Sequence, residues 1–245
     1  MEKLFLKNGI TVEEKEVADL DSFCDFLLEK NKAFNLTAIR EPAEVYEKHF
    51  LDSLMGREKF ESGKKILEVG SGGGFPSVPL KIFNRDLNFT LLEATGKKCA
   101  FLNEVKQRFN FSDFTVVNAR AEEYVKTCRE SFDAVTARAV ASLNVLCELC
   151  LPYLKVGGSA IFYKQQSDEE INQAQSSIKL LGGKIKDVYK YSLPSFPNNV
   201  IYLALSNLFV DAKNASPLDV LFSNVERVCN SNPFLSFTSC FKGFW

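Results

Sequence analysis

The sequence predicts an α/β fold built on a doubly wound, mostly parallel sheet. From residue 64 onward, short apolar runs alternate with segments of helical periodicity. This alternation is typical of parallel strands joined by crossover helices. The first apolar run, "KILEV" at residues 65–69, leads directly into the glycine-rich "GSGGGFP" at residues 70–76. A strand, a glycine loop and a helix in this order bring the backbone close to a ligand at the carboxyl edge of the sheet.

Five parallel strands are expected, each ending before a helical segment: "KKILEV" at 64–69, "NFTLLEA" at 88–94, "FTVVNA" at 114–119, "FDAVTA" at 132–137 and "GSAIFYK" at 158–164. Two more strands are expected at residues 184–191 and 200–204, with a connection between them that is too short for a helical crossover. We therefore expect these two to form an antiparallel pair at the sheet edge, which makes seven strands in all.

Three regions are expected along the chain. Residues 1–60 form an N-terminal helical extension packed on the core, with helices at 11–30 and 43–54 and a capping box between Thr11 and Glu14. Residues 61–207 form the ligand-binding domain. Residues 208–245 fit no period and are expected to form an irregular tail.

The composition limits the function classes. The 30 Lys and Arg residues are balanced by 31 Asp and Glu residues, for a net charge of −1, so nucleic-acid binding would need a local basic face. The seven cysteines show no metal-like pairing and the first residues no signal peptide, which favours a cytoplasmic protein with reduced thiols. The apolar runs are too short to span a membrane, so a soluble protein is expected, and we expect it to be a monomer. With His49 as the single histidine, neither a histidine metal cluster nor a Ser–His–Asp triad is expected. Cys147 and Cys150 lie in an apolar helical segment and are expected to pack in the core.

The glycine loop indicates the class of ligand. Gly70, Gly72 and Gly74 follow a GxGxG spacing, and Phe75 stands at the third glycine position of the dinucleotide fingerprint. Glu68 lies two residues before the first glycine. A tight loop with a preceding acid suits a ligand that carries an ammonium and a carboxylate but no phosphate, and S-adenosylmethionine is such a ligand.

Further candidate residues stand at the ends of the later strands. Glu93 ends the second strand, where its carboxylate can accept both hydroxyls of a ribose, in NAD as well as in S-adenosylmethionine. The backbone of Ala121 and Glu122 is expected beside an adenine, although Glu122 also suits an ordinary helix N-terminus. Arg138 follows the fourth strand and faces the crevice where the strand order reverses, either as a ligand contact or as a structural arginine. Lys164 is a weaker candidate of the same kind.

Six segments together resemble one family: "NLTAI" at 35–39, "HFLDSL" at 49–54, "EVGSGGGFPSVPL" at 68–80, "LLEATGKKCAFL" at 91–102, "ARAEEY" at 119–124 and "ARAVASL" at 137–143. Their order and spacing are similar to those of the bacterial small-subunit ribosomal RNA methyltransferase G family, also called glucose-inhibited division protein B. The resemblance covers residues 30–165.

The resemblance implies a Rossmann-like class I methyltransferase that moves a methyl group from S-adenosylmethionine to guanine N7 in a decoding-region loop of the small-subunit (16S) ribosomal RNA. The substrate is then this RNA or the small ribosomal subunit. The positions that match cofactor contacts are Gly70, Phe75, Glu93, Ala121, Glu122 and Arg138. His49, Asp52 and Ser53 match a family signature near the site. Guanine N7 carries no proton, so no general base is expected, and Arg138 and Lys164 are candidate substrate contacts.

Two other readings stay open. One is a non-catalytic binding protein with the cofactor fold, favoured by a tail that lacks the basic ending common in the family and by Lys164-Gln165 where the family usually has Lys-Gly. The other is a methyltransferase for a small molecule or protein. The RNA reading predicts Lys97, Lys98, Arg138 and Lys164 near one rim. An NAD-dependent oxidoreductase is least favoured, because the third glycine is misplaced.

Overall fold

The computed structural model describes residues 2–165, 167–194 and 196–207. The strands of the described chain all belong to one sheet and are β1 (Lys65–Val69), β2 (Asn88–Glu93), β3 (Phe114–Asn118), β4 (Phe132–Arg138), β5 (Leu154–Gln165), β6 (Gly183–Leu193) and β7 (Phe196–Asn207). The helical segments are α1 (Glu2–Lys7), α2 (Glu14–Phe34), α3 (Pro42–Val45), the π-helix η1 (Tyr46–Leu51), α4 (Asp52–Met55), the 3₁₀-helix η2 (Arg57–Lys59), α5 (Ser77–Phe83), α6 (Gly96–Arg108), α7 (Ala121–Cys128), α8 (Leu143–Cys150), the 3₁₀-helix η3 (Leu151–Tyr153) and α9 (Asp168–Leu180).

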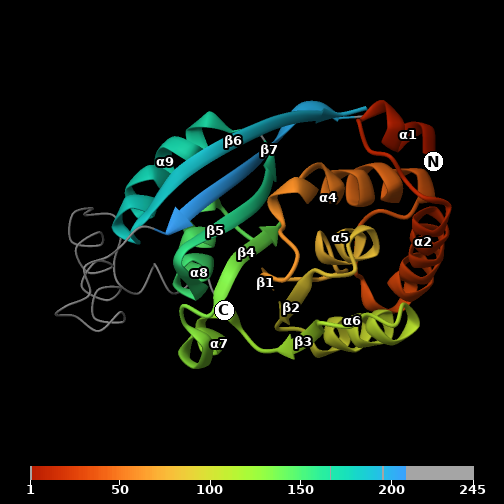
Figure 1. The fold of residues 1–245 in the computed structure, drawn as a ribbon, viewed down its shortest axis with the longest axis horizontal. Helices are drawn as coiled ribbons and strands as arrows, with labels where there is room; N and C mark the ends of the chain where they lie inside the picture. The colour runs from red at the N-terminus through yellow and green to blue at the C-terminus, as the bar shows by residue number, and fades with distance from the viewer. Residues whose placement is uncertain (1, 166, 195, 208–245) are drawn as a thin grey trace. The chain divides into compact units, whose positions relative to one another are not determined.

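The sheet has the order β3-β2-β1-β4-β5-β7-β6 (Figure 1). Strands β1 to β5 are parallel, whereas β7 runs antiparallel to both β5 and β6. The doubly wound, seven-stranded α/β sheet and its antiparallel final pair are thus confirmed. The order reverses between β1 and β4, so the ends of these strands frame the crevice in which such sheets bind ligands.

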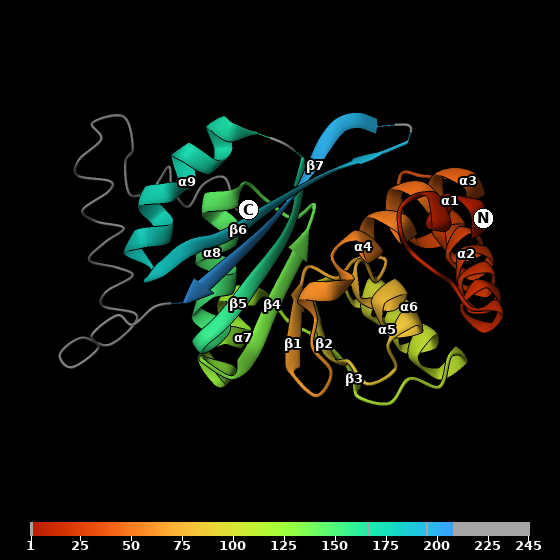
Figure 2. The same ribbon diagram turned by 45° about the horizontal axis from the view of Figure 1, so that its top comes forward.

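Helices cover both faces of the sheet (Figure 2). α7, α8 and α9 lie on one face, and α5 and α6 lie on the other, with α2 packed over them. The second face holds a large apolar cluster to which the N-terminal helices contribute Phe5, Leu20 and Phe23 and α6 contributes Phe101. The helices before residue 60 are therefore part of the same core, although the boundaries predicted at residues 60 and 207 stay predictions.

The N-terminal helices differ in detail from the expectation. α2 begins at Glu14, and its capping contact is made by Glu13, whose backbone N–H donates to the Glu16 carboxylate at 2.7 Å. The predicted capping box between Thr11 and Glu14 is wrong, because Glu13 and Glu16, a pair with the same spacing two residues later, form the capping box instead. The helix expected at residues 43–54 exists, but its middle turn, η1, is a π-helix. π-helical turns are rare in proteins, and those that occur are often found at functional sites.

The apolar helical segment expected to carry Cys147 and Cys150 is α8. It ends at Cys150, and η3 follows with Pro152 in its first turn. Proline lacks the N–H that would continue an α-helix, which accounts for the end of α8 at this point. Cys147 and Cys150 are free, buried and part of the core, as expected.

Two further expectations concern the described residues only. None of the described helices carries an apolar run that is long enough to cross a membrane. The described part of the chain also holds no group of three or more histidine, cysteine or acidic side chains that could bind a metal ion. The predicted irregular tail at 208–245 lies outside the described residues.

Candidate cofactor-binding and active site

The glycine loop leaves β1 in a conformation that side chains disfavour. Gly72 has φ +53° and Gly74 has φ +84°. A Cβ on Gly74 would lie 2.5 Å from Val78 Cγ2, so this glycine is needed for packing of the loop against α5. A Cβ on Gly72 would meet nothing closer than a backbone oxygen at 3.8 Å. Of these two glycines, only Gly72 faces open space, where a ligand can approach the backbone.

Glu93 closes this loop from the neighbouring strand. Its side chain is buried, with 6% of the residue exposed. One carboxylate oxygen accepts from the Gly72 N–H at 2.9 Å, and the other accepts from the Thr95 N–H at 2.8 Å. Each oxygen keeps a further lone pair. The carboxylate is thus held rigidly at the open side of the loop and can accept two more hydrogen bonds, as the two hydroxyls of a ribose would require.

Glu68 is the most unusual group of the site. It is completely buried, and neither of its carboxylate oxygens has a hydrogen-bond partner. Burial raises the pKa of Glu68 to about 7, although the adjacent Ser77 and Ser71 oppose this shift. A buried carboxyl without a partner costs free energy unless a donor reaches it, either the adjacent Ser77 hydroxyl, which is itself unpaired, or a donor of a ligand. Glu68 therefore fits the ammonium group that the sequence predicted for the ligand.

Phe75 lies among aromatic rings behind the loop. Its ring stacks on the His49 imidazole, with centroids 4.3 Å apart, and also contacts Phe23 and Phe50. Only 8% of the residue is exposed. The ring is therefore committed to the core, and the predicted cofactor contact of Phe75 is left to its backbone.

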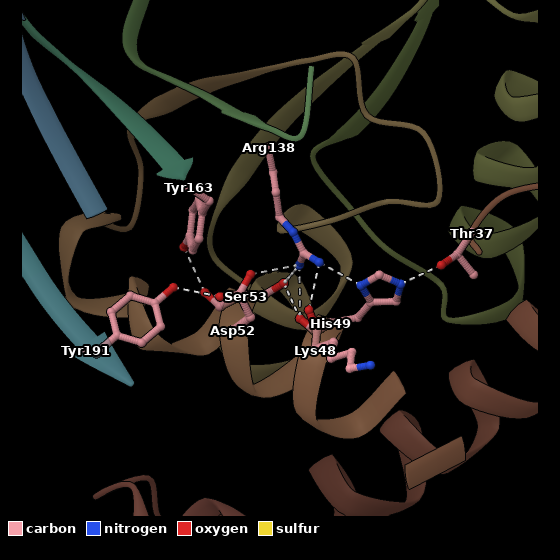
Figure 3. A network of polar contacts seen from close by, with 8 residues as sticks. All are labelled: Thr37, Lys48, His49, Asp52, Ser53, Arg138, Tyr163 and Tyr191. Carbon is pink, nitrogen blue, oxygen red and sulfur yellow. Dashed lines mark hydrogen bonds and ion pairs between the residues drawn. The ribbon is translucent and has the colours of Figure 1, made fainter. Parts of the chain in front are cut away.

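Arg138, the last residue of β4, reaches across to η1 (Figure 3). Its Nη2 donates to the Lys48 carbonyl at 2.7 Å and lies 2.6 Å from His49 Nδ1. Because a guanidinium only donates, Nδ1 is the acceptor, and Nε2 carries the proton and donates to Thr37 Oγ1 at 2.7 Å. Burial, followed by the charge of Arg138, lowers the pKa of His49 to about 3. The imidazole is neutral, with both nitrogens in use.

The same guanidinium holds a buried carboxylate. Arg138 Nη1 lies 3.2 Å from the Asp52 carboxylate, and Asp52 accepts from the Tyr191 hydroxyl at 2.7 Å (Figure 3). Burial raises the pKa of Asp52, and Arg138 and Tyr191 offset part of that shift. The neighbouring Ser53 carbonyl accepts from the Tyr163 hydroxyl at 2.8 Å. Arg138 is therefore a structural link between β4 and the helical extension, and a ligand contact in addition stays a prediction.

The predicted adenine loop opens α7. Ala121 and Glu122 are its first two residues, and backbone N–H groups at this position have no partner within the helix. The Ala121 carbonyl is fixed by the Tyr153 hydroxyl at 2.5 Å, which holds the loop in place. Asn118, which the sequence analysis missed, donates to the Glu93 and Ala94 carbonyls at 2.9 and 3.0 Å. Its position at the end of a predicted strand was the feature of the sequence that could have identified it.

Lys164 is not a free cation. Its Nζ donates to the Ala141 carbonyl at 2.9 Å and pairs with Glu170 at 2.6 Å. Glu170 also accepts from the Leu143 N–H at 2.8 Å. The two side chains hold the loop between β4 and α8, which carries the 38% exposed Val140. We call Lys164 and Glu170 the loop clamp.

Only two of the four cations predicted to line a rim for RNA are without a partner in the described chain. Arg138 and Lys164 have their partners within the protein, whereas Lys97 and Lys98 form no ion pair with any residue that the structure describes. Both lysines lie in the first turn of α6, just after Glu93 and its loop. Of the predicted rim, they are the two cations left for a substrate near the site.

The geometry agrees with comparisons to known proteins. The model of the family described as "rRNA small subunit methyltransferase G" matches residues 16–195. The chain belongs to the rRNA small subunit methyltransferase G family. The family member of Clostridium beijerinckii is 42% identical over 190 residues, which are 76% of this chain and 80% of that protein. The member of Caldanaerobacter subterraneus subsp. tengcongensis is 44% identical over 190 residues, with the same coverage of 76% and 80%.

The resemblance seen in the sequence is thereby confirmed, and with it the class of reaction. As a member of the methyltransferase G family, the chain is an S-adenosylmethionine-dependent methyltransferase of small-subunit ribosomal RNA. The reading as a non-catalytic binding protein and the reading with a small-molecule or protein substrate are accordingly set aside.

Solved structures agree on the fold. P. horikoshii TYW2 in complex with MeSAdo superposes with a TM-score of 0.53 at 13% identity, over 64% of this chain and 62% of that chain. A ribosomal protein L11 methylase from Lactobacillus delbrueckii subsp. bulgaricus gives a TM-score of 0.52 at 14% identity, over 66% and 80%. The Rossmann-like class I methyltransferase fold of this methyltransferase G family member is thus confirmed.

Proposed function

We propose that this protein methylates N7 of a guanine in a decoding-region loop of the small-subunit ribosomal RNA, and that it acts as a cytoplasmic monomer on the RNA or on the small subunit. The observation that carries the cofactor part is the pair of buried carboxylates around the glycine loop. Glu68 has no partner of its own, and Glu93 is fixed on the Gly72 N–H with lone pairs to spare. The base and the atom are argued from the family resemblance and from the chemistry of the site.

The residues present fit S-adenosylmethionine. Glu68 would accept the ammonium group, Glu93 would accept the ribose hydroxyls, and the free N–H groups of Ala121 and Glu122 would face the adenine edge. Gly72 leaves the room that a ligand needs at the backbone. When bound, S-adenosylmethionine supplies a methyl group on a positively charged sulfur.

Guanine N7 suits a site without a general base. This atom has a lone pair and no proton, so the protein has only to align it with the methyl group. His49 cannot serve as a base, because its Nδ1 accepts from Arg138 and its Nε2 donates to Thr37. In the described chain no other histidine exists. The roles left to the protein are orientation of the base and exclusion of water.

The test is methyl transfer from labelled S-adenosylmethionine to small ribosomal subunits, and separately to naked 16S RNA, from a strain that lacks this gene. We expect label in the small-subunit RNA as N7-methylguanine. Glu93→Ala should lose at least about tenfold in cofactor affinity, since it removes hydrogen bonds to a charged group. Glu123→Ala, which alters an exposed acid of α7, is the matched control and should behave like the unaltered protein.

Two results would contradict the proposal. Label on another atom of the RNA would remove the N7 assignment. Cofactor binding in calorimetry without any labelled RNA, in either substrate, would remove the guanine assignment altogether. Light scattering of the purified protein measures its molar mass in solution and so tests whether it is a monomer.

A further inference from the structure

We propose that a basic cavity at the end of the α2–α6 helix pair binds a phosphodiester of the RNA, remote from the cofactor. The cavity has a volume of about 520 Å³, and its polar lining includes Lys15, Ser22, Arg85, Arg108, Asn110 and Ser112. We call these residues the basic cavity. That its ligand is RNA rests on the proposed function.

The first guanidinium of the basic cavity is held in a fixed plane. Arg85 donates from Nη1 to the Phe109 carbonyl at 2.8 Å and pairs through Nη2 with Asp19 at 2.7 Å. Its guanidinium carbon lies 4.8 Å from the centroid of the Phe111 ring. A guanidinium has five N–H groups, so Arg85 keeps donors for a ligand.

The second guanidinium is held in the same way. Arg108 donates from Nε and Nη2 to the Ser22 hydroxyl at 3.2 and 3.1 Å, and its guanidinium carbon lies 5.1 Å from the centroid of the Phe26 ring. Its Nη1 donors have no partner among the described residues. Two planar forks that are already ordered on aromatic faces lose little entropy when they bind an oxyanion, which is why arginine is favoured for phosphate.

The remaining lining groups add donors and positive charge. The Lys15 ammonium, the Asn110 amide and the Ser112 hydroxyl form no hydrogen bond or ion pair with another residue that the structure describes. Asp19 is the single acid that lines the cavity, and Arg85 already occupies it. Three cations therefore face one carboxylate in a protein whose net charge is −1. The chemistry of the basic cavity selects a phosphate oxyanion.

The place of the basic cavity favours RNA over a free anion. α2 and α6 run antiparallel, because Lys30 pairs with Glu104 while Ser22 contacts Arg108. α6 starts beside the Glu93 loop and ends at Arg108 with 13 residues, so the cavity lies roughly 20 Å from the cofactor site. α2 and α6 lie side by side on the same face of the sheet in Figures 1 and 2. A ligand that reaches both places must be large, and a folded RNA carries phosphates at such distances.

The test compares two charge-removing variants of the full chain. Lys15→Gln removes a cation that forms no ion pair with the described residues, and Lys15→Gln with Arg108→Gln removes two cations. The control, Lys126→Gln with Lys179→Gln, removes two exposed cations from α7 and α9 on the other face. RNA affinity is measured over a salt series, together with KM, kcat and cofactor affinity, and thermal unfolding checks the fold.

We expect the double variant to raise KM for the RNA about tenfold and to lower the salt slope by about 1 to 2, because each phosphate contact contributes about 0.7–0.9 to the slope. The single variant should show about half of this effect. Cofactor affinity and kcat should not change. If both cavity variants match the control while the unaltered protein methylates RNA, the basic cavity is not an RNA site.

The outcome separates this inference from the proposed function. RNA binding that depends on Lys15 without any methylation would overturn the proposed function and leave the basic cavity standing. Inorganic phosphate that abolishes RNA binding at an ionic strength at which chloride does not would show a site for free phosphate, and would overturn the assignment to a phosphodiester.

Discussion

Arg138 Nη2 lies 2.6 Å from Nδ1 of His49, although 89 positions separate the two residues in the sequence. The contact joins the carboxyl end of β4, at the crevice of the sheet, to the π-helical turn of the N-terminal extension. Both residues were singled out from the sequence, one as a ligand contact and one as part of a family signature. Their contact explains why the only histidine of the chain is neutral and is not available as a base.

The pH dependence of stability should report His49. Its folded-state pKa is about 3, well below the ordinary value of 6.5, so folding favours the neutral ring. The stability that it contributes is complete above pH 6.5 and is lost as the pH falls toward 3, at up to about 1.4 kcal/mol per pH unit. His49→Gln should flatten this part of the curve in urea unfolding, because the amide can accept from Arg138 and donate to Thr37 without titrating. A ring proton signal that titrates near pH 6.5 in the native protein would contradict the geometry.

Glu68 should couple cofactor binding to proton release. Its pKa is raised from 4.5 to about 7, so the free protein holds a proton on Glu68 below neutral pH and loses stability as the pH rises through 7. An ammonium group beside the carboxylate would lower that pKa. We expect cofactor binding to strengthen from pH 5.5 to 7.5 and to release close to one proton at about pH 6.

The measurement is calorimetry at pH 6 in two buffers that differ in ionisation enthalpy. Glu68→Gln should abolish the proton release, weaken cofactor binding at pH 8 by about tenfold or more, and make the free protein more stable at that pH by about 1–3 kcal/mol. Proton release that persists in Glu68→Gln would assign it to another group.

Substitutions of two glycines of the loop should have separate effects, one on stability and the other on cofactor binding. Gly74→Ala should lower the free energy of unfolding by about 2–4 kcal/mol, because its Cβ would lie 2.5 Å from Val78 Cγ2 at a positive φ. Gly72→Ala should cost only about 1–2 kcal/mol from its φ, yet it should weaken cofactor binding more than about tenfold. Urea unfolding and calorimetry on the same two proteins give both numbers. Equal losses of stability, with unchanged cofactor binding in Gly72→Ala, would show that Gly72 does not face the ligand.

The loop clamp should act through the loop and not through the substrate. Lys164→Met and Glu170→Gln should each slow methyl transfer several-fold, raise hydrogen exchange at residues 139–142, and leave cofactor affinity within about twofold. Lys164→Arg should restore part of the rate, since it can keep the pair with Glu170. If Glu170→Gln were fully active while Lys164→Met were not, Lys164 would be a direct substrate contact, as the sequence suggested.

Local patterns in the sequence, such as apolar runs and helical periodicity, were enough to predict most of the fold. Apolar strand segments alternate with helical segments along the chain, so β1 to β4 were predicted within one residue at either end. β5 begins earlier than expected, at Leu154, because it contains Gly157 at φ +83° and a register shift against β4. Glycines of this kind read as a turn in the sequence, and only the pairing with β4 shows that the strand continues through them.

The site was predictable only as a list of separate residues. Motif spacing located Gly72 and Glu93, but their hydrogen bond depends on how β1 and β2 are paired. No spacing rule leads from Arg138 to His49, since the contact bridges the sheet and the helical extension. The missing partner of Glu68 is likewise a property of the packed interior and has no signature in the sequence.

The antiparallel end of the sheet imposes an order on the folding of the chain during synthesis. β6 pairs only with β7, and β7 lies between β6 and β5, so β6 cannot join the sheet before residue 207 has left the ribosome. The glycine loop and its neighbour β4 are complete once residue 138 has emerged. Asp52 receives its bond from Tyr191 of β6, and a nascent chain therefore carries a finished cofactor loop beside a carboxylate that still lacks one of its two partners.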